Sequence, residues 1–152
     1  MPAGARRQQS DGGGMTLEGG CLCGGVTYQI VGELPASDGD LPLPACCHCT
    51  DCQHLTGGAF FASCMAPLAQ FTLTSGDDCL QRYESQPGVF RSFCRRCGST
   101  MFYENREEPE QLHVALGTID GFATKPRAHI FVRSKAPWYD INDDLPRFEA
   151  YP

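Results

Sequence analysis

The sequence predicts a mainly β protein built from short antiparallel strands. Seventeen glycines and eleven prolines are spread along the 152 residues. No long apolar run has a helical period, and short apolar or alternating segments are separated by turn residues. Neither an internal repeat nor a βαβ pattern with a glycine-rich phosphate loop is present, so the pattern does not predict an α/β fold.

The expected elements follow one another closely along the chain. Residues 26–30 alternate apolar and polar side chains, as a strand with one buried face does. Residues 32–44 are rich in Pro, Asp and Gly and predict a surface loop, and residues 51–56 predict one helical turn that a glycine pair ends. Residues 59–66 predict a buried strand. Further strands are expected at residues 71–74, 79–84, 89–93, 100–103, 112–116 and 128–132.

Length and composition predict a single folded domain. Residues 1–14 contain almost no apolar side chains, so we expect a disordered tail there and one domain over residues 15–152. Arg6 and Arg7 are not followed by an apolar stretch, so no signal peptide is expected and the predicted location is the cytoplasm.

The charge balance indicates which partners to expect. The formal net charge is −6 and the pI is near 5.1, which disfavours binding to a phosphate backbone. No segment is long and apolar enough to cross a bilayer. We therefore expect neither nucleic acid nor a membrane as a partner.

Cysteines provide the strongest functional signal. The chain has ten, of which seven lie in three short clusters. In the reducing cytosol, closely spaced cysteines are more often metal ligands or reactive thiols than disulfides. Zinc takes about four ligands, and a structural site fills all four from protein whereas a reactive site leaves one position open. Seven sulfurs in a four-plus-three arrangement therefore suggest two zinc ions per chain, one closed and one open.

The two outer clusters together supply four thiolates. Two residues separate Cys94 from Cys97, so a tight turn can direct both sulfurs at one ion. One residue separates Cys21 from Cys23, so both side chains lie on the same face of an extended chain. Alternative interpretations are a redox-active dithiol or simply buried cysteines, and iron also occupies tetrahedral sulfur sites. Zinc is preferred because it makes a redox-neutral scaffold.

The middle cluster supplies three thiolates. Cys47, Cys49 and Cys52 have the spacing of a turn that enters a short helix, so all three can meet one ion. An open fourth position would hold an incoming thiol as thiolate. The alternative is a second structural site closed by protein. Candidates for the fourth ligand are water, a small-molecule thiol, Cys46, Cys64, His48 and His54.

Three motifs together resemble one known family. They are Gly19-Gly20-Cys21-Leu22-Cys23-Gly24-Gly25-Val26, the cluster from Cys47 to Cys52 followed by Gly57-Gly58-Ala59-Phe60, and Phe93-Cys94-Arg95-Arg96-Cys97-Gly98. The chain resembles the glutathione-dependent formaldehyde-activating family, which includes the centromere protein V type domain, from about Leu17 to about Trp138. The resemblance implies a β-tent fold of small antiparallel sheets.

The resemblance also implies roles for the seven cysteines. Cys21, Cys23, Cys94 and Cys97 would hold a structural zinc, and Cys47, Cys49 and Cys52 a catalytic zinc. The implied reaction joins glutathione and formaldehyde to S-(hydroxymethyl)glutathione and is classed, in reverse, as a carbon–sulfur lyase. Expected partners are a glutathione-like thiol and a small aldehyde. The alternative function is a non-catalytic, zinc-stabilised binding module.

Several other residues have less specific interpretations. His48 and His54 are candidates for proton transfer beside the metal. Trp138 and Tyr139 are expected to cover the core. The three remaining cysteines are interpreted as small buried hydrophobes, and the three arginines near the third cluster as ligand contacts or, more commonly, solvated surface groups: Cys46, Cys64 and Cys79, and Arg91, Arg95 and Arg96.

Overall fold

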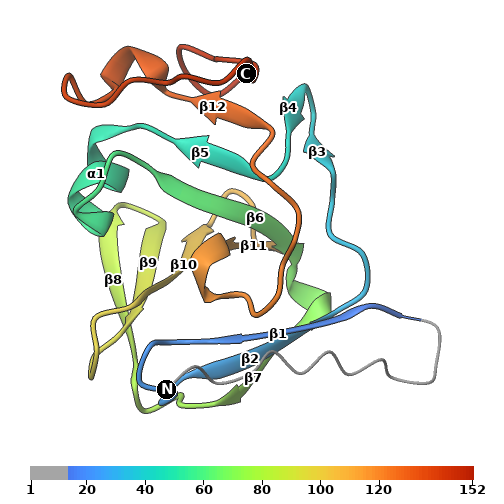
Figure 1. Cartoon of the computed structure of the whole chain (residues 1–152). Helices are drawn as coiled ribbons and strands as arrows, with labels where there is room; N and C mark the ends of the chain where they lie inside the picture. The colour runs from blue at the N-terminus through green and yellow to red at the C-terminus, as the bar shows by residue number, and fades with distance from the viewer. Residues whose placement is uncertain (1–13) are drawn as a thin grey trace. The chain divides into compact units, whose positions relative to one another are not determined.

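The computed structural model describes residues 14–152 and is mainly β, as predicted. Within that range it has twelve strands, three short 3-10 helices and one α-helix (Figure 1). Residues 1–13 lie outside the described part, so the predicted tail is not tested. The described chain divides into two compact units, residues 14–34 with 66–123, and residues 35–65 with 124–152. The expectation of a single domain over residues 15–152 stays a prediction.

The first unit contains two sets of antiparallel strands. A three-stranded sheet has the order β1-β2-β7, and four further strands have the order β8-β9-β10-β11. Most of these strands match the predicted segments to within one or two residues. Their bounds are β1 Thr16–Gly20, β2 Thr27–Val31, β7 Phe71–Ser75, β8 Leu80–Gln86, β9 Val89–Cys94, β10 Thr100–Asn105 and β11 Gln111–Ala115. The 3-10 helices η1 Leu68–Gln70 and η2 Leu116–Thr118 belong to the same unit.

An aromatic group packs inside the first unit. The ring of Tyr28 lies 5.5 Å from that of Phe71 and 5.3 Å from that of Phe102, between centroids. The Tyr28 hydroxyl forms a 2.8 Å hydrogen bond with the hydroxyl of Thr118. Gly19 pairs with Tyr28 across β1 and β2, and a Cβ on Gly19 would lie 2.4 Å from the Tyr28 ring. The sequence analysis did not predict β1, because a glycine pair usually indicates a turn. In the structure Gly19 lies within the strand because the Tyr28 ring occupies the space that a side chain would need.

The second unit contains strands that pair in both directions. β5 Ala45–Cys47 pairs parallel with β12 Ala128–Ile130 and antiparallel with residues 61–63 of β6 Phe61–Pro67, a strand whose first five residues belong to this unit. The 3-10 helix η3 Val132–Ser134 follows β12. Parallel pairing departs from the purely antiparallel expectation. The long chain segment between β5 and β12 permits it, since a parallel pair needs a long connection.

The segment 32–44 is not wholly the predicted surface loop. It contains the hairpin of β3 Ser37–Asp38 and β4 Leu41–Pro42. The loop interpretation was wrong for Leu41 and Leu43, which are almost completely buried in the hydrophobic core of the second unit. That core consists of Leu41, Leu43, Ala45, Met65, Ala128 and Ile130.

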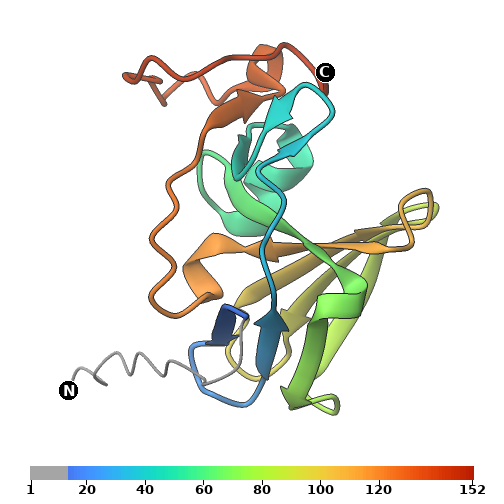
Figure 2. The same ribbon diagram turned by 90° about the vertical axis from the view of Figure 1, so that its right-hand side faces the viewer.

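The C-terminus of the chain lies beside this hairpin. Figures 1 and 2 both show the C-terminus beside β3 and β4, where the Tyr151 hydroxyl donates a hydrogen bond to the Asp38 carboxylate.

Helix α1, Thr50–Thr56, follows β5 and has the predicted end. Gly57 has a φ of 66°, and its N–H donates to the carbonyl of Gln53 at 2.8 Å. Glycine takes this left-handed conformation without the steric cost that other residues have. The helix therefore ends after seven residues.

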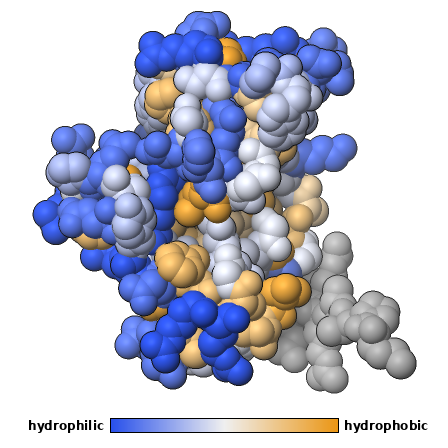
Figure 3. Space-filling view, turned by 90° about the vertical axis from the view of Figure 1, so that its left-hand side faces the viewer, coloured by the Kyte–Doolittle hydropathy of each residue, from blue (hydrophilic) through white to orange (hydrophobic). Residues whose placement is uncertain are grey.

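The surface carries both hydrophilic and hydrophobic residues. On the face drawn in Figure 3, hydrophilic residues surround small groups of hydrophobic ones. No helix in residues 14–152 combines the length and the hydropathy that a membrane span requires.

Candidate metal centres

The first unit brings the two outer cysteine clusters together. Cys21 and Cys23 lie in the turn between β1 and β2, Cys94 is the last residue of β9, and Cys97 lies in the turn that leads to β10. All four Sγ atoms lie within 4.8 Å of one another, with 3.6 Å between Cys21 and Cys23 and 3.8 Å between Cys23 and Cys94. Four thiolates around one zinc, with Zn–S of about 2.3 Å, would be separated by about 3.8 Å. The set therefore fits a tetrahedral metal ion with no further ligand. We call it the four-cysteine cluster.

Backbone hydrogen bonds shape both turns. The N–H of Cys21 donates to the Val26 carbonyl at 3.0 Å, and the N–H of Val26 returns to the Cys21 sulfur at 3.2 Å. In the second turn the Gly98 N–H donates to the Cys94 carbonyl at 2.7 Å, with a φ of 76° at Gly98. An N–H that points at sulfur favours the thiolate, which is the form that binds metal.

The thiols of this cluster differ in acidity. Hydrogen bonds from the side chain and then the backbone of Ser99 lower the pKa of Cys97 to about 5. The Gly25 N–H acts to lower the pKa of Cys23, but hydrogen bonding with the Cys21 thiol, together with the neighbouring Cys97 and Cys94 thiols, outweighs it and raises that pKa to about 11. Without metal, neutral pH thus favours a mixture of thiolate and thiol. A divalent cation would favour the ionised form of all four.

The positive charge of Arg96 interacts with this cluster. A hydrogen bond with Cys79, followed by the charge of Cys23, raises the pKa of Arg96. The positive charge of Arg96 would therefore offset part of the negative charge of the thiolates. Arg95 is exposed, whereas Arg91 is buried and donates through Nε to the Ser85 hydroxyl at 3.2 Å. The interpretation of Arg91 as a solvated surface group was therefore wrong.

The second unit brings the middle cluster together. Cys47 is the last residue of β5, Cys49 is the N-cap of α1, and Cys52 lies in its first turn. Their Sγ atoms lie within 4.8 Å of one another, and the Cys52 N–H donates to the Cys49 sulfur at 3.4 Å. These three sulfurs fit three corners of a tetrahedral site. We call them the three-cysteine cluster.

Residues 46–49, which lead from β5 into α1, place their side chains on two opposite faces of the chain. Side chains alternate along an extended chain, so Cys47 and Cys49 point one way while Cys46 and His48 point the other. Burial and then the charge of Asp143 raise the pKa of Cys46 to about 12. Cys46 is therefore protonated and buried. This agrees with its interpretation as a small buried hydrophobe.

In residues 14–152, no fourth His, Cys, Asp or Glu joins the three-cysteine cluster. His48 bonds through Nε2 to His129, His54 is exposed, and Cys64 is buried outside the cluster. Hydrogen bonding with the thiols of Cys49 and Cys52, and then burial, raise the pKa of Cys47. The thiols thus hinder one another's ionisation, and a cation bound to the three sulfurs would favour their ionised forms.

Aromatic rings surround His48. Its ring centroid lies 5.3 Å from that of Phe60 and 5.9 Å from that of Tyr139, and these two rings are 5.6 Å apart. Burial, and then the charge of His129, lower the pKa of His48 to about 4, so the imidazole is neutral at physiological pH. The expectation that Trp138 covers the core was wrong, because 69% of its surface is exposed.

Sequence reasoning missed the partners of His48. His129 bonds to His48 and to Asp143, and Gln53 bonds to the His48 carbonyl. The sequence analysis expects a strand at residues 128–132 and gives no role to His129 within it. Its burial could have been inferred from the apolar neighbours Ala128 and Ile130. Asp143 stands in an acidic, loop-like segment where no pattern distinguishes it from its neighbours.

Comparison with known proteins shows the family to which the chain belongs. The family model described as "Glutathione-dependent formaldehyde-activating enzyme" matches residues 16–134, so the chain belongs to that family. The chain is 29% identical over 135 residues to a Halomonas elongata protein named "Putative glutathione-dependent formaldehyde-activating enzyme", covering 84% of this chain and 82% of the relative.

Two further proteins are similar to parts of the chain. A Schizosaccharomyces pombe protein named as an uncharacterized lyase is 30% identical over 95 residues, which cover 60% of this chain and 61% of that protein. A crystal structure of a Rhodobacter sphaeroides protein matches with a TM-score of 0.54 and 23% identity, covering 70% of this chain and 90% of that one. This last similarity shows a shared fold.

Proposed function

We propose that the protein is a zinc-dependent carbon–sulfur lyase of the formaldehyde-activating type. It would bind glutathione or a similar thiol at the three-cysteine cluster and add it to formaldehyde, or release it from the adduct. Membership of the formaldehyde-activating family and the similarity to a protein named as a lyase support the reaction class. A cytoplasmic location, where glutathione is abundant and thiols stay reduced, belongs to the same proposal.

One observation carries the proposal: within residues 14–152, the second cluster has three sulfurs and no fourth protein ligand. Zinc sites with three protein ligands and an open position are typical of catalysis, whereas four protein sulfurs are typical of structure. The four-cysteine cluster provides the contrasting case in the same chain. We therefore assign the structural zinc to Cys21, Cys23, Cys94 and Cys97, and the catalytic zinc to Cys47, Cys49 and Cys52.

The chain's own residues would hold and orient the reacting groups. Bound to the three cysteines, zinc would supply a Lewis acid that favours the thiolate form of an incoming thiol. In the synthetic direction the sulfur forms a bond to the carbonyl carbon of formaldehyde, the C=O π bond breaks, and the thiol proton ends on the new hydroxyl oxygen. Phe60 and Tyr139 pack on the His48 ring, which keeps the peptide between Cys47 and Cys49 in place.

The experiment that tests this function measures zinc content and thiol binding on the same protein. Zinc per chain is determined by elemental analysis, and glutathione is then titrated by calorimetry. We expect two zinc ions in the wild type and glutathione binding that is lost in Cys49→Ala. The matched control is Cys64→Ala, which also removes one cysteine from the second unit but lies outside the cluster, and we expect it to bind glutathione as the wild type does.

The remaining outcomes separate the two functions that the sequence leaves open. Two zinc ions without glutathione binding would support the non-catalytic binding module and contradict the lyase. One zinc ion per chain would contradict the two-site assignment itself.

A further inference from the structure

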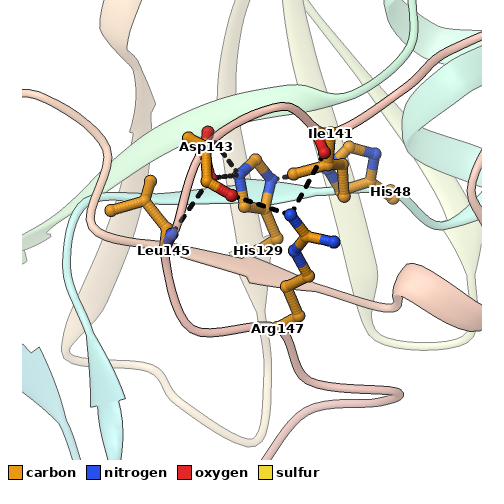
Figure 4. Close-up of polar contacts among 6 residues, drawn as sticks. All are labelled: His48, His129, Ile141, Asp143, Leu145 and Arg147. Atoms are coloured by element: carbon orange, nitrogen blue, oxygen red, sulfur yellow. Dashed lines mark hydrogen bonds and ion pairs between the residues drawn. The ribbon is translucent and has the colours of Figure 1, made fainter.

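A chain of three hydrogen-bonded side chains runs through the second unit to its surface. His48 Nε2 lies 2.8 Å from His129 Nδ1, and His129 Nε2 lies 3.2 Å and 3.1 Å from the two carboxylate oxygens of Asp143 (Figure 4). His48 is fully buried and His129 is 3% exposed, whereas 49% of the Asp143 side chain is exposed. The chain thus connects the residue between Cys47 and Cys49 to a carboxylate at the surface.

Simple core packing does not account for this arrangement. Burying an imidazole is costly unless its nitrogens are hydrogen-bonded, and an apolar side chain would fill the same space without that requirement. The pair His48–His129 is placed on the side of β5 opposite to Cys47 and Cys49. It therefore cannot supply a metal ligand directly, and what it can do is fix the backbone from which the ligands project.

The surface end of the chain is itself held in place. The Asp143 carboxylate accepts a 3.1 Å hydrogen bond from the Leu145 N–H. Arg147 donates through Nη2 to the backbone carbonyls of Asp143 at 2.7 Å and Ile141 at 3.1 Å, as Figure 4 shows. The backbone of His129 also bonds to this segment, since its carbonyl accepts the N–H of Phe148 at 2.8 Å. Asp143 is thus presented to His129 in a set position.

A second contact holds the same peptide from the helix side. Gln53 Nε2 donates to the His48 carbonyl at 2.8 Å and to the Ser134 carbonyl at 2.8 Å. The His48 N–H donates to the Ile130 carbonyl at 2.9 Å. The side-chain Nε2, the backbone N–H and the backbone carbonyl of His48 are therefore bonded, so the peptide that separates two candidate ligands has little freedom to move.

We propose that Asp143, acting through His129 and His48, is a positioning residue for the three-cysteine cluster and raises its affinity for metal. The inference rests on the proposed function only in taking this cluster as a metal site. Asp143 lies beyond residue 134, where the family match ends, so the assignment concerns this chain's own C-terminal segment. Ligands that are held before the ion arrives lose less conformational freedom on binding, which strengthens binding.

The test measures metal affinity without substrate. Metal-free protein is titrated with cobalt(II) in competition with a chelator, and the cobalt–thiolate absorption reports each site. We expect Asp143→Ala to weaken binding at the three-cysteine cluster by roughly 10-fold or more, as loss of groups that orient ligands commonly does, and to alter its ligand-field bands. Binding at the four-cysteine cluster should not change. Asp143→Asn, which keeps an oxygen that can accept from His129, should restore part of the affinity.

The matched control is Asp144→Asn, which removes the same charge from the next residue along the exposed segment. We expect it to bind cobalt as the wild type does. Equal affinity of the three-cysteine cluster in Asp143→Ala and Asp144→Asn would overturn the positioning role alone, and so would equal weakening of both clusters by Asp143→Ala. A wild type that binds only one cobalt ion would overturn both the positioning role and the proposed function.

Discussion

The four-cysteine and three-cysteine clusters use the same ligand type in different surroundings. The first joins two β-turns of one unit, and Cys23 is exposed while Cys94 is fully buried. The second lies where a strand becomes a helix, and buried histidines hold the peptide between two of its sulfurs. Four cysteines complete the coordination of an ion, so the bound ion itself can fix their positions. Three cysteines leave one position open, so we expect surrounding residues to hold these ligands in place. The predictions below test this contrast.

Loss of a ligand from the four-cysteine cluster should have the largest effect on stability. A structural metal site contributes folding free energy directly, so we expect Cys94→Ala to lower the free energy of unfolding by about 4 kcal/mol or more. Cys49→Ala should lower it by less than half as much, because hydrogen bonds within the second unit still hold the segment around His48. Urea unfolding of the zinc-loaded proteins measures both. Equal destabilisation by the two substitutions would remove the distinction between a structural and a reactive site.

A substitution at Gly19 should destabilise the first unit without removing a ligand. A Cβ there would meet the Thr118 carbonyl oxygen and the Tyr28 ring at 2.4 Å. We expect Gly19→Ala to cost about 2 kcal/mol through steric overlap. Gly117→Ala is the matched control in the same unit, because a Cβ on Gly117 has no neighbour within 4 Å. Thermal unfolding with zinc analysis should show a lower midpoint for Gly19→Ala, two zinc ions retained and no shift for the control. Loss of one ion in Gly19→Ala would show that packing and metal binding in this unit are not separable.

The histidine support behind the three-cysteine cluster should have the smallest effect, visible in its pH dependence. The pKa of His48 is lowered to about 4, whereas an unfolded histidine titrates near 6.5. The unfolded chain therefore takes up the proton first, and the contribution of His48 to stability is full above about pH 6.5 and falls as the pH drops towards 4. Nitrogen-15 NMR of the zinc-loaded protein should show His48 ring signals that stay constant between pH 8 and 5.5. A titration midpoint near 6.5 would contradict the burial and bonding described here.

Local patterns were enough to predict much of the fold and the cysteine sets. The alternation in residues 26–30 indicated β2, and Gly57 indicated where α1 ends. Cysteine spacing within each cluster is equally local, whereas the joining of the two outer clusters, 71 residues apart, was expected from the ligand count and the family resemblance. The structure brings together the same two sets of four and three sulfurs. β1 was missed because the space that its Gly19 leaves is filled by Tyr28, a tertiary contact that no local pattern reveals. Asp143 was missed for the same reason, since its importance depends on His129, fourteen residues earlier in the chain.

The contrast between the clusters is tested most directly by cadmium-113 NMR of protein loaded with two cadmium ions. Each ion gives its own signal, and the chemical shift depends on the number of sulfur ligands. We predict two signals, of which only the one from the three-cysteine cluster moves when glutathione is added, because only that ion has a position for another sulfur. Two signals that both remain in place, or a shift of the signal from the four-cysteine cluster, would contradict the assignment of one closed and one open site.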